Sequence, residues 1–411
     1  MSLRLLHTSD WHLGHILHGF ERAREHALVL DWLLATIEKE SVDALLVAGD
    51  IFDSANPSTE AQQLWYRFLV DAWRRVPHLQ VVVIGGNHDS PSRLDSIDPF
   101  LRALGRLHVV GGAARNGSAI DVDRHVVPLF DRTGKRTAWV AAVPHLRATE
   151  TGTGDEAAVA FGIRKFYDQV LARIRAQRSD EAIVAMGHLH LVGGQVSSIS
   201  ERRLSVGNEA AIGCDLFPPD VAYVALGHLH LAQAVGGRDH IRYSGSLIPL
   251  ALSERTYPHQ VVLVVLDGTR ASEIRPLSAP RLIELPRIPP TGTATVDEAL
   301  CEIRALPPRT PAAGVGWPLL EVEVRLERPE PSLRQKLEEA LQGKAARLAR
   351  LGVTMTGTGA VLGGVEVRTI SDLTPEEVFR AKWARHHKGE PPPDLLRTFQ
   401  ELIQMVHEDI A

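Results

Sequence analysis

The sequence predicts an α/β fold in which a largely parallel or mixed sheet is covered by helices on both faces. Apolar strand-like runs alternate with helix-length segments up to about Leu266, and this is the pattern of strands joined by crossover helices. The chain has 411 residues, of which 44% are hydrophobic. Such a chain can fill a sizeable core, and two or three domains are expected from its length.

The first part of the chain contains the clearest strands and helices. Three segments carry apolar residues at helical spacing, namely Glu21–Ile37, Glu60–Arg74 and Gly162–Arg175. Seven apolar runs are predicted as strands: Leu3–His7, Ala44–Ala48, Val81–Ile84, Ala138–Val143, Ile183–Met186, Tyr223–Leu226 and Val261–Leu266.

A proline-rich segment then predicts a linker over residues 275–293. It contains Pro276, Pro280, Pro286, Pro289 and Pro290, and proline cannot continue a helix or a central strand. The first domain is therefore expected to cover residues 1–274.

A small α+β domain is expected over residues 294–370. Val296–Leu306 has a helical pattern, and Leu319–Leu326 alternates apolar with charged residues as a half-buried strand does. Ser332–Leu351 is charged and rich in Ala and Leu, which predicts a second helix, and the glycine-spaced run Val353–Val367 follows it.

The tail, residues 371–411, predicts a helical hairpin. Thr374 is a candidate cap, Pro375 suits the first helical position and Glu377 closes a capping box. A last helix is expected from about Asp394. Its apolar stripe consists of Leu395, Leu396, Phe399, Leu402, Ile403, Val406 and Ile410. This hairpin either folds back on its own domain or offers a docking surface for a partner helix or coiled coil.

Composition excludes several classes of protein. The formal net charge is −5, with 45 Lys and Arg against 50 Asp and Glu. This balance disfavours a protein that grips nucleic acid tightly by itself, although it permits a local basic patch or a partner that supplies the grip. No run approaches the ~18 apolar residues of a membrane span. An apolar strand begins at Leu3 with no basic lead or cleavage site, so no secretory signal is expected.

The two cysteines, Cys214 and Cys301, provide neither a disulfide framework nor a thiolate metal site. We therefore expect a cytoplasmic, nucleoid-associated protein with no membrane partner. The 19 histidines permit a metal site built from imidazole and carboxylate without any thiol.

Five segments share one layout, in which an apolar strand ends in a group of metal-capable side chains. They are Thr8–His12, Gly49–Asp53, Gly85–Asp89, Met186–His190 and Leu226–His230. Because the carboxyl ends of strands in an open α/β sheet point into one crevice, these side chains are expected to converge. Residues two apart in extended backbone, as in D-x-H and H-x-H, lie on the same face.

The candidate ligands indicate a site for two metal ions. Carboxylate, imidazole and amide groups suit Mn²⁺, Fe²⁺ or Zn²⁺, whereas a closed structural zinc site needs four ligands that usually include cysteine. Two ions ~3.5–4 Å apart can clamp the attacking and leaving oxygens of a phosphoryl displacement and acidify the water between them. The seven candidates are Asp10, His12, Asp50, Asn87, His188, His228 and His230.

The ordered set D-x-H, G-D-x-x-D, G-N-H-D, G-H and G-H-x-H resembles the calcineurin-like metallophosphoesterases. The strings HTSDWHLG, DALLVAGDIFD, GGNHDS and LGHLH…YSGSLIPLALSE are similar to those of nuclease subunits that process DNA double-strand ends in bacteria. The likeness is dense over roughly the first 255 residues and only architectural beyond them. It implies a sandwich of mixed sheets flanked by helices, a small α+β capping domain, and C-terminal helices that bind the coiled-coil base of an ATPase subunit.

The resemblance also implies a role for each ligand. Asp10, His12 and His230 would bind the first ion, Asp50 would bridge both ions, and Asn87, His188 and His228 would bind the second. His190, two residues after His188, is the alternative ligand, but the resemblance favours the residue directly after Gly187.

Two further residues receive roles from the resemblance. His88 would face the scissile phosphate without ligating metal and would stabilise charge or protonate the leaving oxygen. Asp53 lies where many relatives carry histidine. As a carboxylate it would orient His88.

The activity implied is that of a DNA nuclease that uses two divalent ions, Mn²⁺ in first place and Mg²⁺ as the alternative. It would act as a 3′–5′ exonuclease on duplex ends and as an endonuclease on hairpins and single strands, by hydroxide attack on phosphorus, in DNA repair, recombination and replication. The family also implies a homodimer within a heterotetramer. The sequence contains no G-x-x-x-x-G-K-[ST] loop, so ATP would be bound by the partner subunit.

Two other functions remain open at this point. The first is a small-molecule or cyclic-nucleotide phosphodiesterase, or a phosphatase, which would use the same ligands. The extra domain and the helical tail favour DNA over such a substrate. The second is a non-catalytic scaffold, which is disfavoured because none of the expected ligands is missing from the sequence.

Overall fold

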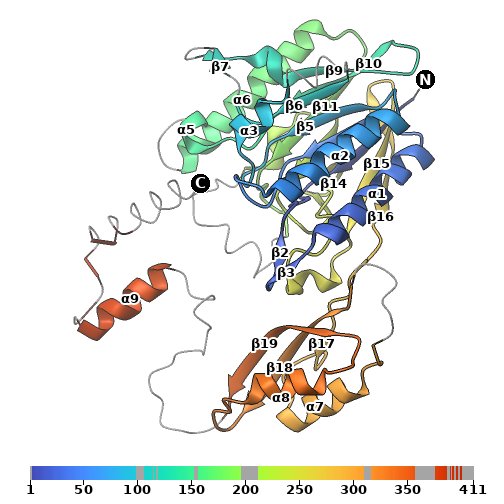
Figure 1. The fold of residues 1–411 in the computed structure, drawn as a ribbon. Coiled ribbons are helices and arrows are strands. Elements are labelled where there is room, and N and C mark those ends of the chain that lie inside the picture. The colour runs from blue at the N-terminus through green and yellow to red at the C-terminus, as the bar shows by residue number, and fades with distance from the viewer. Residues whose placement is uncertain are drawn as a thin grey trace. The chain divides into compact units, whose positions relative to one another are not determined.

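The computed structural model describes residues 2–98, 106–113, 115–116, 119–151, 156–195, 212–309, 316–356 and 375–386, with single positions between 389 and 399 (Figure 1). The chain divides into two compact units. The first comprises Met1–Glu284 with Ala313–Gly316, and the second comprises Leu285–Ala312 with Trp317–Ala411. The division between Glu284 and Leu285 falls within the segment where the prolines predict a linker.

The first unit is built on two six-stranded sheets. One sheet has four parallel strands, β1, β4, β5 and β6, and two antiparallel strands, β15 and β16, at one side. Its order is β16 (Arg270–Ser278), β15 (Gln260–Asp267), β1 (Leu3–Thr8), β4 (Ala44–Ala48), β5 (Gln80–Ile84) and β6 (Leu107–Val110).

The second sheet is also mixed. Its four central strands are parallel, and an antiparallel strand lies at each edge. Its order is β13 (Gln233–Val235), β14 (Arg238–Tyr243), β12 (Val221–Gly227), β11 (Ala182–His188), β10 (Arg136–Ala142) and β9 (Val126–Phe130).

The two sheets pack face to face, and helices cover their outer faces (Figure 1). Strand β4 is apolar throughout because both of its faces are buried. Leu46 and Ala48 lie in the core between the sheets, while Leu45 and Val47 pack in the core under α1 (Ala23–Lys39) and α2 (Thr59–Arg75). On the other side, α6 (Glu156–Gln177) covers the second sheet. The expected sandwich of mixed sheets flanked by helices is confirmed.

Short elements complete the first unit. Ser58 begins α2, because its hydroxyl oxygen accepts a hydrogen bond from the backbone N–H of Ala61. The remaining short elements are β2 (Ile16–Leu17), β3 (Phe20–Glu21), α3 (Pro91–Asp95), β7 (Arg115–Asn116), β8 (Ala119–Ile120), α5 (Ala148–Thr151), and the 3-10 turns Val122–His125, Cys214–Leu216 and Leu252–Thr256.

The prediction of a linker from residue 275 is wrong for its first four residues. Strand β16 continues to Ser278, and Pro276 is paired with Val262 of β15. Proline is tolerated here because β16 is an edge strand, where a missing N–H removes no hydrogen bond from a second neighbour.

The second unit has a sheet of three parallel strands, β17 (Arg287–Ile288), β18 (Leu319–Leu326) and β19 (Arg347–Met355). Helices α7 (Val296–Ala305) and α8 (Leu333–Ala340) share one apolar core with this sheet. The predicted helix over Ser332–Leu351 is therefore wrong at its end. The chain turns at Gly343, whose φ is 73°, and Arg347–Leu351 belong to β19, where the exposed Arg350 pairs with Glu321 of β18.

The tail contains α9 (Pro375–His386). The ring of Phe379 stacks on that of Phe399, with centroids 4.3 Å apart. The proposed cap Thr374 and most of the last predicted helix lie outside the described residues, although Leu395, Leu396 and Phe399 are helical. Among the described helices, none combines the length and the apolar character needed to cross a membrane.

Candidate metal centre

The loops that follow β1, β4, β5, β11 and β12 bring the predicted ligands together. The side chains form three groups of three, and within each group one ligand atom of every residue lies within 4.8 Å of the ligand atoms of the other two. The groups are Asp10, His12 and His230; His12, Asp50 and His88; and Asp10, Asp50 and His188. Because Asp10, His12 and Asp50 each belong to two groups, the three groups overlap and form one continuous cluster.

The backbone of the ligand loops is strained. Among the described non-glycine residues with positive φ are Asp10 (53°), His12 (46°), Asp50 (50°) and His228 (102°), and such conformations cost ~1–3 kcal/mol each. Two hydrogen bonds hold the first two loops side by side: the N–H of Asp10 donates to Gly49 (3.0 Å) and that of His12 donates to Asp50 (3.0 Å). The strain thus coincides with the predicted ligands.

Glycine at two positions allows these loops to approach each other. A Cβ on Gly86 would overlap the carboxylate and the backbone nitrogen of Asp50. A Cβ on Gly227 would overlap the carbonyl oxygen of Ala48. The glycines of G-G-N-H-D and G-H-L-H therefore provide room for the ligand side chains.

Asp50 lies at the centre of the cluster. Its Oδ2 is 3.4 Å from Nε2 of His12 and 3.3 Å from Nε2 of His188, while its Oδ1 accepts a hydrogen bond from the N–H of His88 (2.9 Å). Burial opposes ionisation of this carboxyl, but the histidines His188 and His12 outweigh burial and hold the pKa of Asp50 well below its ordinary value. The position suits a carboxylate that bridges two cations.

Asp10 is buried beside it and oriented by two donors. The hydroxyl of Ser9 donates to its Oδ2 (2.5 Å), and the N–H of His228 donates to its Oδ1 (2.9 Å). One carboxylate thus links the loop after β1 to the loop after β12.

His12 and His230 present the same nitrogen to the cluster. Nδ1 of His12 lies 3.2 Å from Oδ1 of Asp53, and Nδ1 of His230 lies 2.9 Å from Oε1 of Glu254. In both residues Nε2 is buried and has no hydrogen-bond partner among the described residues. A buried imidazole nitrogen without a hydrogen-bond partner becomes a strong ligand for a divalent ion once its proton is lost.

His188, Asn87 and His228 meet on the other side of Asp50. Nδ1 of His188 donates to the carbonyl oxygen of Ala48 (2.9 Å), and its Nε2 lies 2.9 Å from Oδ1 of Asn87. Nδ1 of His228 lies 3.2 Å from the same Asn87 oxygen. A neutral His188 with its proton on Nδ1 has only a lone pair on Nε2, so a proton or a metal ion is needed between these two acceptors.

His88 stands next to the cluster, but its relation to Asp53 differs from the prediction. Nδ1 of His88 donates to the backbone carbonyl oxygen of Asp53 (2.8 Å), whereas the Asp53 carboxylate contacts His12 and His15. The expectation that the Asp53 carboxylate orients His88 is therefore wrong, because that side chain turns toward the loop after β1. Nε2 of His88 is buried, and no group in the described part of the chain forms a hydrogen bond with it.

The electrostatics are those of a site prepared for cations. Burial lowers the pKa of His12, His188 and His230, yet neighbouring carboxylates outweigh it in each case. The pKa of His12 is held well above its ordinary value by Asp50 and Asp53, that of His188 is raised to about 9 by Asp50, and that of His230 is raised by Glu254. The carboxylates therefore attract positive charge, which protons or divalent ions can supply.

Two acidic residues with structural roles here are not predicted from the sequence. Glu254 is buried behind His230, and its only signal is an acidic residue that ends the apolar string LIPLALSE. Asp89 accepts hydrogen bonds from the N–H groups of Ile51, Phe52 and Gly86. Burial, together with the charge of Asp50, raises the pKa of Asp89 to about 6.

The donor set fits two divalent metal ions. Three buried Nε2 atoms, those of His12, His88 and His230, have no hydrogen-bond partner within the described ranges, and two carboxylates lie among them. Nitrogen and oxygen donors of this mixture suit borderline first-row ions.

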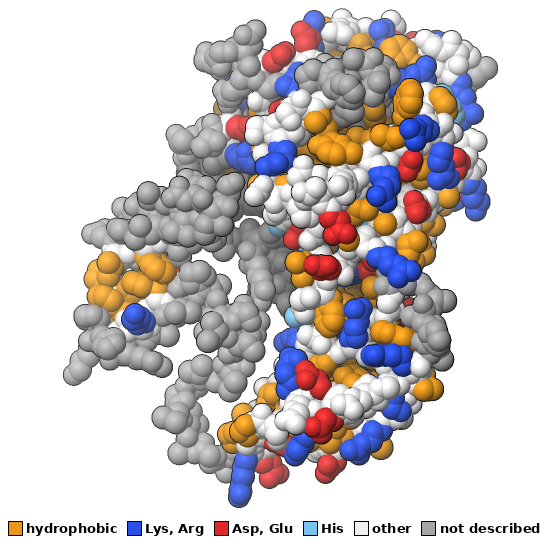
Figure 2. Space-filling model, in the orientation of Figure 1, with side chains coloured by type: hydrophobic (Ala, Val, Ile, Leu, Met, Phe, Trp, Pro, Cys, Tyr) orange, Lys and Arg blue, Asp and Glu red, His pale blue; other side chains and the backbone are white. Residues whose placement is uncertain are grey.

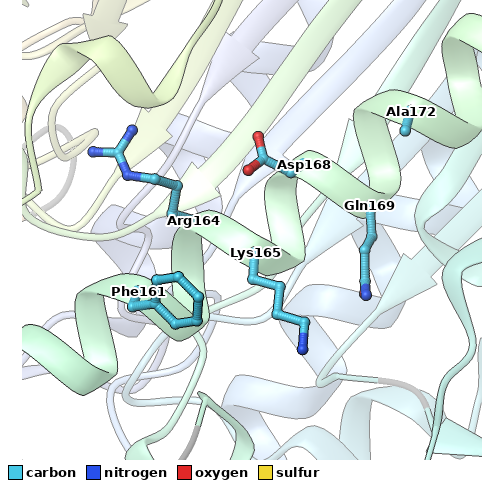
Figure 3. A pocket seen from close by; sticks show the side chains of 6 residues that line it. All are labelled: Phe161, Arg164, Lys165, Asp168, Gln169 and Ala172. Carbon is cyan, nitrogen blue, oxygen red and sulfur yellow. The ribbon is translucent and has the colours of Figure 1, made fainter.

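A separate hollow lies on the surface of α6. It has a volume of about 320 Å³ and is lined by Phe161, Arg164, Lys165, Asp168, Gln169 and Ala172, which follow one another along the helix (Figure 3). Its lining contains none of the clustered carboxylates or histidines.

Two family models match the chain. One, described as calcineurin-like phosphoesterase, matches residues 3–232, and the other, described as type 5 capsule protein repressor C-terminal domain, matches residues 281–387. The first covers all five ligand loops described above.

Curated relatives match almost the whole chain. The SbcD component of the SbcCD nuclease from Rhodobacter capsulatus is 40% identical over 389 residues, which are 92% of this chain and 94% of the relative. The SbcD protein of Escherichia coli K12 is 31% identical over 94% of both chains. That of Bacillus subtilis 168 is 35% identical over 64% of this chain and 66% of the relative. With its converging carboxylates and imidazoles, the chain belongs to the calcineurin-like phosphoesterases and, within them, to the SbcD family, and it is a metal-dependent phosphodiesterase with a nuclease role.

Proposed function

We propose that the chain is a Mn²⁺-dependent DNA nuclease that acts as a 3′–5′ exonuclease on duplex ends and as an endonuclease on hairpins and single strands. The observation that carries this proposal is the set of three buried Nε2 atoms, those of His12, His88 and His230, that have no hydrogen-bond partner in the described part of the chain and belong to the cluster that contains Asp10 and Asp50. The names of the SbcD relatives support DNA as the substrate.

The proposed ligands divide into two sets that share one carboxylate. Asp10, His12 and His230 would hold the first ion, Asn87, His188 and His228 would hold the second, and Asp50 would be shared between the two sets. When bound, the two ions would neutralise charge on the phosphate and lower the pKa of a water molecule between them. The residues of the chain orient these groups through the hydrogen bonds of Ser9, Asp53 and Glu254.

His88 is proposed to contact the scissile phosphate. Its Nδ1–H donates a hydrogen bond to the backbone carbonyl oxygen of Asp53. Nε2 is therefore the ring atom that can exchange a proton with the substrate. Burial lowers the pKa of His88 below its ordinary value. The negative charge of a bound phosphodiester favours the protonated imidazole, which can then donate to the departing sugar oxygen.

Manganese is favoured over magnesium by the donor atoms. Mg²⁺ prefers an octahedral set of oxygens and retains several waters. The proposed ligands include four imidazoles, and imidazole suits ions such as Mn²⁺ better than it suits Mg²⁺.

The chain is proposed to bind DNA together with a partner. The net charge is −5, and on the face shown in Figure 2 the Lys and Arg side chains are interspersed with acidic and apolar ones. A weak electrostatic grip is expected from such a surface, with the backbone geometry and an accessible end, rather than base contacts, selecting the substrate.

The partner is proposed to be an SbcC-like ATPase that carries a long coiled coil. The relatives are named as components of an SbcCD nuclease. The stacked rings of Phe379 and Phe399 support a helical hairpin in the tail, and a hairpin with an apolar stripe can pack against a coiled coil.

A homodimer within a heterotetramer is proposed, and α2 offers a surface for it. Tyr66, Val70 and Trp73 are 39%, 44% and 52% exposed, and their spacing places them on one side of the helix. The opposite side packs in the core through Trp65, Phe68 and Ala72. An exposed apolar stripe on a helix that is already packed on its own sheet is suited to a self-complementary contact.

The test uses labelled DNA duplexes with Mn²⁺, with Mg²⁺ in parallel. Asp50→Asn and His88→Ala should each lower the cleavage rate by at least ~10²-fold. Asp43→Asn is the matched control, because Asp43 is also a buried carboxylate but lies at the opposite end of β4. Labels placed on the 3′ or the 5′ end report polarity, and melting temperatures show that each variant is folded.

Each alternative function gives a different outcome. Unchanged DNA cleavage in Asp50→Asn would refute the two-ion assignment. Fast turnover of bis(p-nitrophenyl) phosphate without cleavage of DNA would identify a small-molecule phosphodiesterase. Failure to bind Mn²⁺ would favour a scaffold.

A further inference from the structure

Two of the proposed first-ion ligands, His12 and His230, each contact a carboxylate through Nδ1. The Asp53 carboxylate contacts Nδ1 of His12 at 3.2 Å, and the Glu254 carboxylate contacts Nδ1 of His230 at 2.9 Å. The two imidazole rings face each other across the cluster, with centroids 5.3 Å apart and planes at 74°. Each histidine is therefore held between a carboxylate on one nitrogen and the metal cluster on the other.

This arrangement fixes the tautomer of both rings. A carboxylate accepts a hydrogen bond, so the proton of each neutral imidazole lies on Nδ1 and the lone pair lies on Nε2. Both Nε2 atoms are buried without a hydrogen-bond partner from the described residues. One ring nitrogen of each histidine and a carboxylate oxygen of Asp10 lie within 4.8 Å of one another, which is a suitable distance for one ion.

The proposed second-ion ligand His188 is held differently. Its Nδ1 donates to the backbone carbonyl oxygen of Ala48, which is a neutral acceptor. A charged acceptor makes an imidazole more basic and a better ligand than a neutral acceptor does. The two ion positions are therefore unequal in the strength of their histidine ligands.

We infer that Asp53 and Glu254 are positioning residues for the first ion, and that the ion held by Asp10, His12 and His230 is the tighter-bound of the two. This inference rests on the two-ion site of the proposed function. It assigns a role to two carboxylates that do not themselves lie among the metal ligands.

Glu254 is the more rigid of the two carboxylates. Its side chain is fully buried, and its second oxygen accepts a hydrogen bond from the N–H of Leu250 (2.8 Å). The same loop is tied to α1 through Arg22, which donates to the carbonyl oxygen of Pro249 (2.9 Å) and pairs with Glu25. Its loss is expected to have the larger effect.

Asp53 is the more adjustable one. Its side chain is 35% exposed, and its Oδ1 is shared between Nδ1 of His12 and Nδ1 of His15 (3.0 Å). Substitution of this side chain leaves the backbone carbonyl that orients His88 in place. A variant at this position can therefore change the first ion without disturbing His88.

The experiment measures Mn²⁺ binding to the full chain directly, by electron paramagnetic resonance and calorimetric titration, without substrate. The wild type is expected to bind two ions in two unequal steps. Glu254→Gln and Asp53→Asn should each weaken the tighter step by ~10- to 100-fold and leave the weaker step in place. His188→Ala should remove the weaker step and retain the tighter one. Asp43→Asn, the buried control carboxylate, should leave both steps unchanged.

Activity supplies a second readout. A positioning role predicts that Asp53→Asn needs ~10-fold or more additional Mn²⁺ for half-maximal cleavage, whereas kcat at saturating Mn²⁺ stays near that of the wild type. Because Asp53 is partly exposed, this variant remains informative even if Glu254→Gln fails to fold.

The possible failures are distinguishable. A wild-type chain that binds no Mn²⁺ refutes the proposed function itself. A wild type that binds two ions, combined with unchanged affinities in both carboxylate variants, refutes only the positioning role. Loss of the tighter step in His188→Ala refutes the order of affinities.

Discussion

At the scale of single residues, the carboxylate of Asp50 depends on a neighbour that has no side chain. Gly86 follows β5 and lies against the backbone nitrogen and the carboxylate of Asp50. The N–H of Gly86 in turn donates to Asp89 (2.9 Å). The position of the proposed bridging ligand is therefore set by the loop of another strand.

Replacement of Gly86 by alanine should displace Asp50. The added methyl group overlaps the carboxylate, and overpacking of this kind costs ~1–3 kcal/mol. We expect Mn²⁺ affinity and DNA cleavage to fall by ~10²-fold or more, with a lower melting temperature. Normal Mn²⁺ binding in a folded Gly86→Ala chain would show that the loops can separate without loss of the site.

His7 is a buried histidine outside the ligand set. Nδ1 lies 2.9 Å from the hydroxyl of Tyr223, and Nε2 lies 3.1 Å from the carbonyl oxygen of Leu226. Burial lowers its pKa to about 3. The folded chain thus keeps His7 neutral over a range of pH in which the unfolded chain, with an ordinary pKa near 6.5, binds a proton.

The free energy of unfolding of the metal-free chain should therefore depend on pH through His7. As pH falls from about 6.5 toward 3, protonation stabilises the unfolded state, so the His7 contribution to stability is lost by roughly 1 kcal/mol per pH unit. Groups with a raised pKa, such as His188, contribute with the opposite sign and lose stability as pH rises. Urea titrations of the wild type and of His7→Gln, each with a chelator, isolate the effect. The difference in the free energy of unfolding between the two proteins should become smaller as pH falls. A constant difference would contradict it.

The sequence predicts which side chains converge better than it predicts how they bond. Asp10, Asp50 and His188 end apolar strands, and strand ends meet at one edge of a sheet, so their proximity follows from local pattern. The direction of the Asp53 carboxylate and the position of Glu254 depend on loop backbone conformations that no periodicity encodes. For this reason the prediction assigns Asp53 to the wrong histidine and misses Glu254.

At the scale of elements, capping residues determine where helices begin. Thr295 and Glu298 form a reciprocal capping box at the start of α7: the Thr295 hydroxyl accepts from the N–H of Glu298 (3.3 Å), and the Glu298 carboxylate accepts from the N–H of Thr295 (2.7 Å). These bonds satisfy two N–H groups that the helix itself leaves unpaired.

Thr295→Ala should destabilise the second unit by about 1 kcal/mol. Hydrogen exchange of the α7 amides is the appropriate measurement, because it reports on this unit without averaging over the first. Thr293→Ala, outside the capping box, serves as the control. Equal protection of α7 in both variants would mean that the cap contributes nothing measurable.

Elements with strong periodicity are predicted well, and those that depend on pairing are not. Helices α1 and α2 differ from the predicted ranges by only a few residues. Strand β19 begins with alternating arginine, leucine and alanine, a composition that favours a helix in isolation. Its pairing with β18 overrides that propensity.

At the scale of the whole molecule, the exposed stripe on α2 predicts self-association. Trp73→Glu should convert a dimer into a monomer in sedimentation experiments, because a charge in a buried apolar contact is left unpaired. Mn²⁺ binding should not change, since Trp73 is not among the clustered residues. The control is Arg74→Glu, which introduces the same side chain at the residue after Trp73 but outside the stripe. This variant should remain dimeric. A wild-type monomer would exclude this surface as a dimer contact.

The tail is expected to act independently of the phosphodiesterase unit. A chain truncated before Leu373 should fail to co-purify with the proposed SbcC-like partner, while Mn²⁺-dependent cleavage of single strands persists. Retention of the partner by the truncated chain would place the docking surface elsewhere.

Asp89 has a consequence for how metal enters the protein. Its carboxylate, which follows β5, accepts hydrogen bonds from two N–H groups after β4 and from Gly86, so hydrogen bonds within the protein tie these two loops together. Proteins whose metal ligands are unordered beforehand must fold around the incoming ion. Because the Asp89 hydrogen bonds require no ion, we expect one divalent ion to be exchanged for another without unfolding of these two loops.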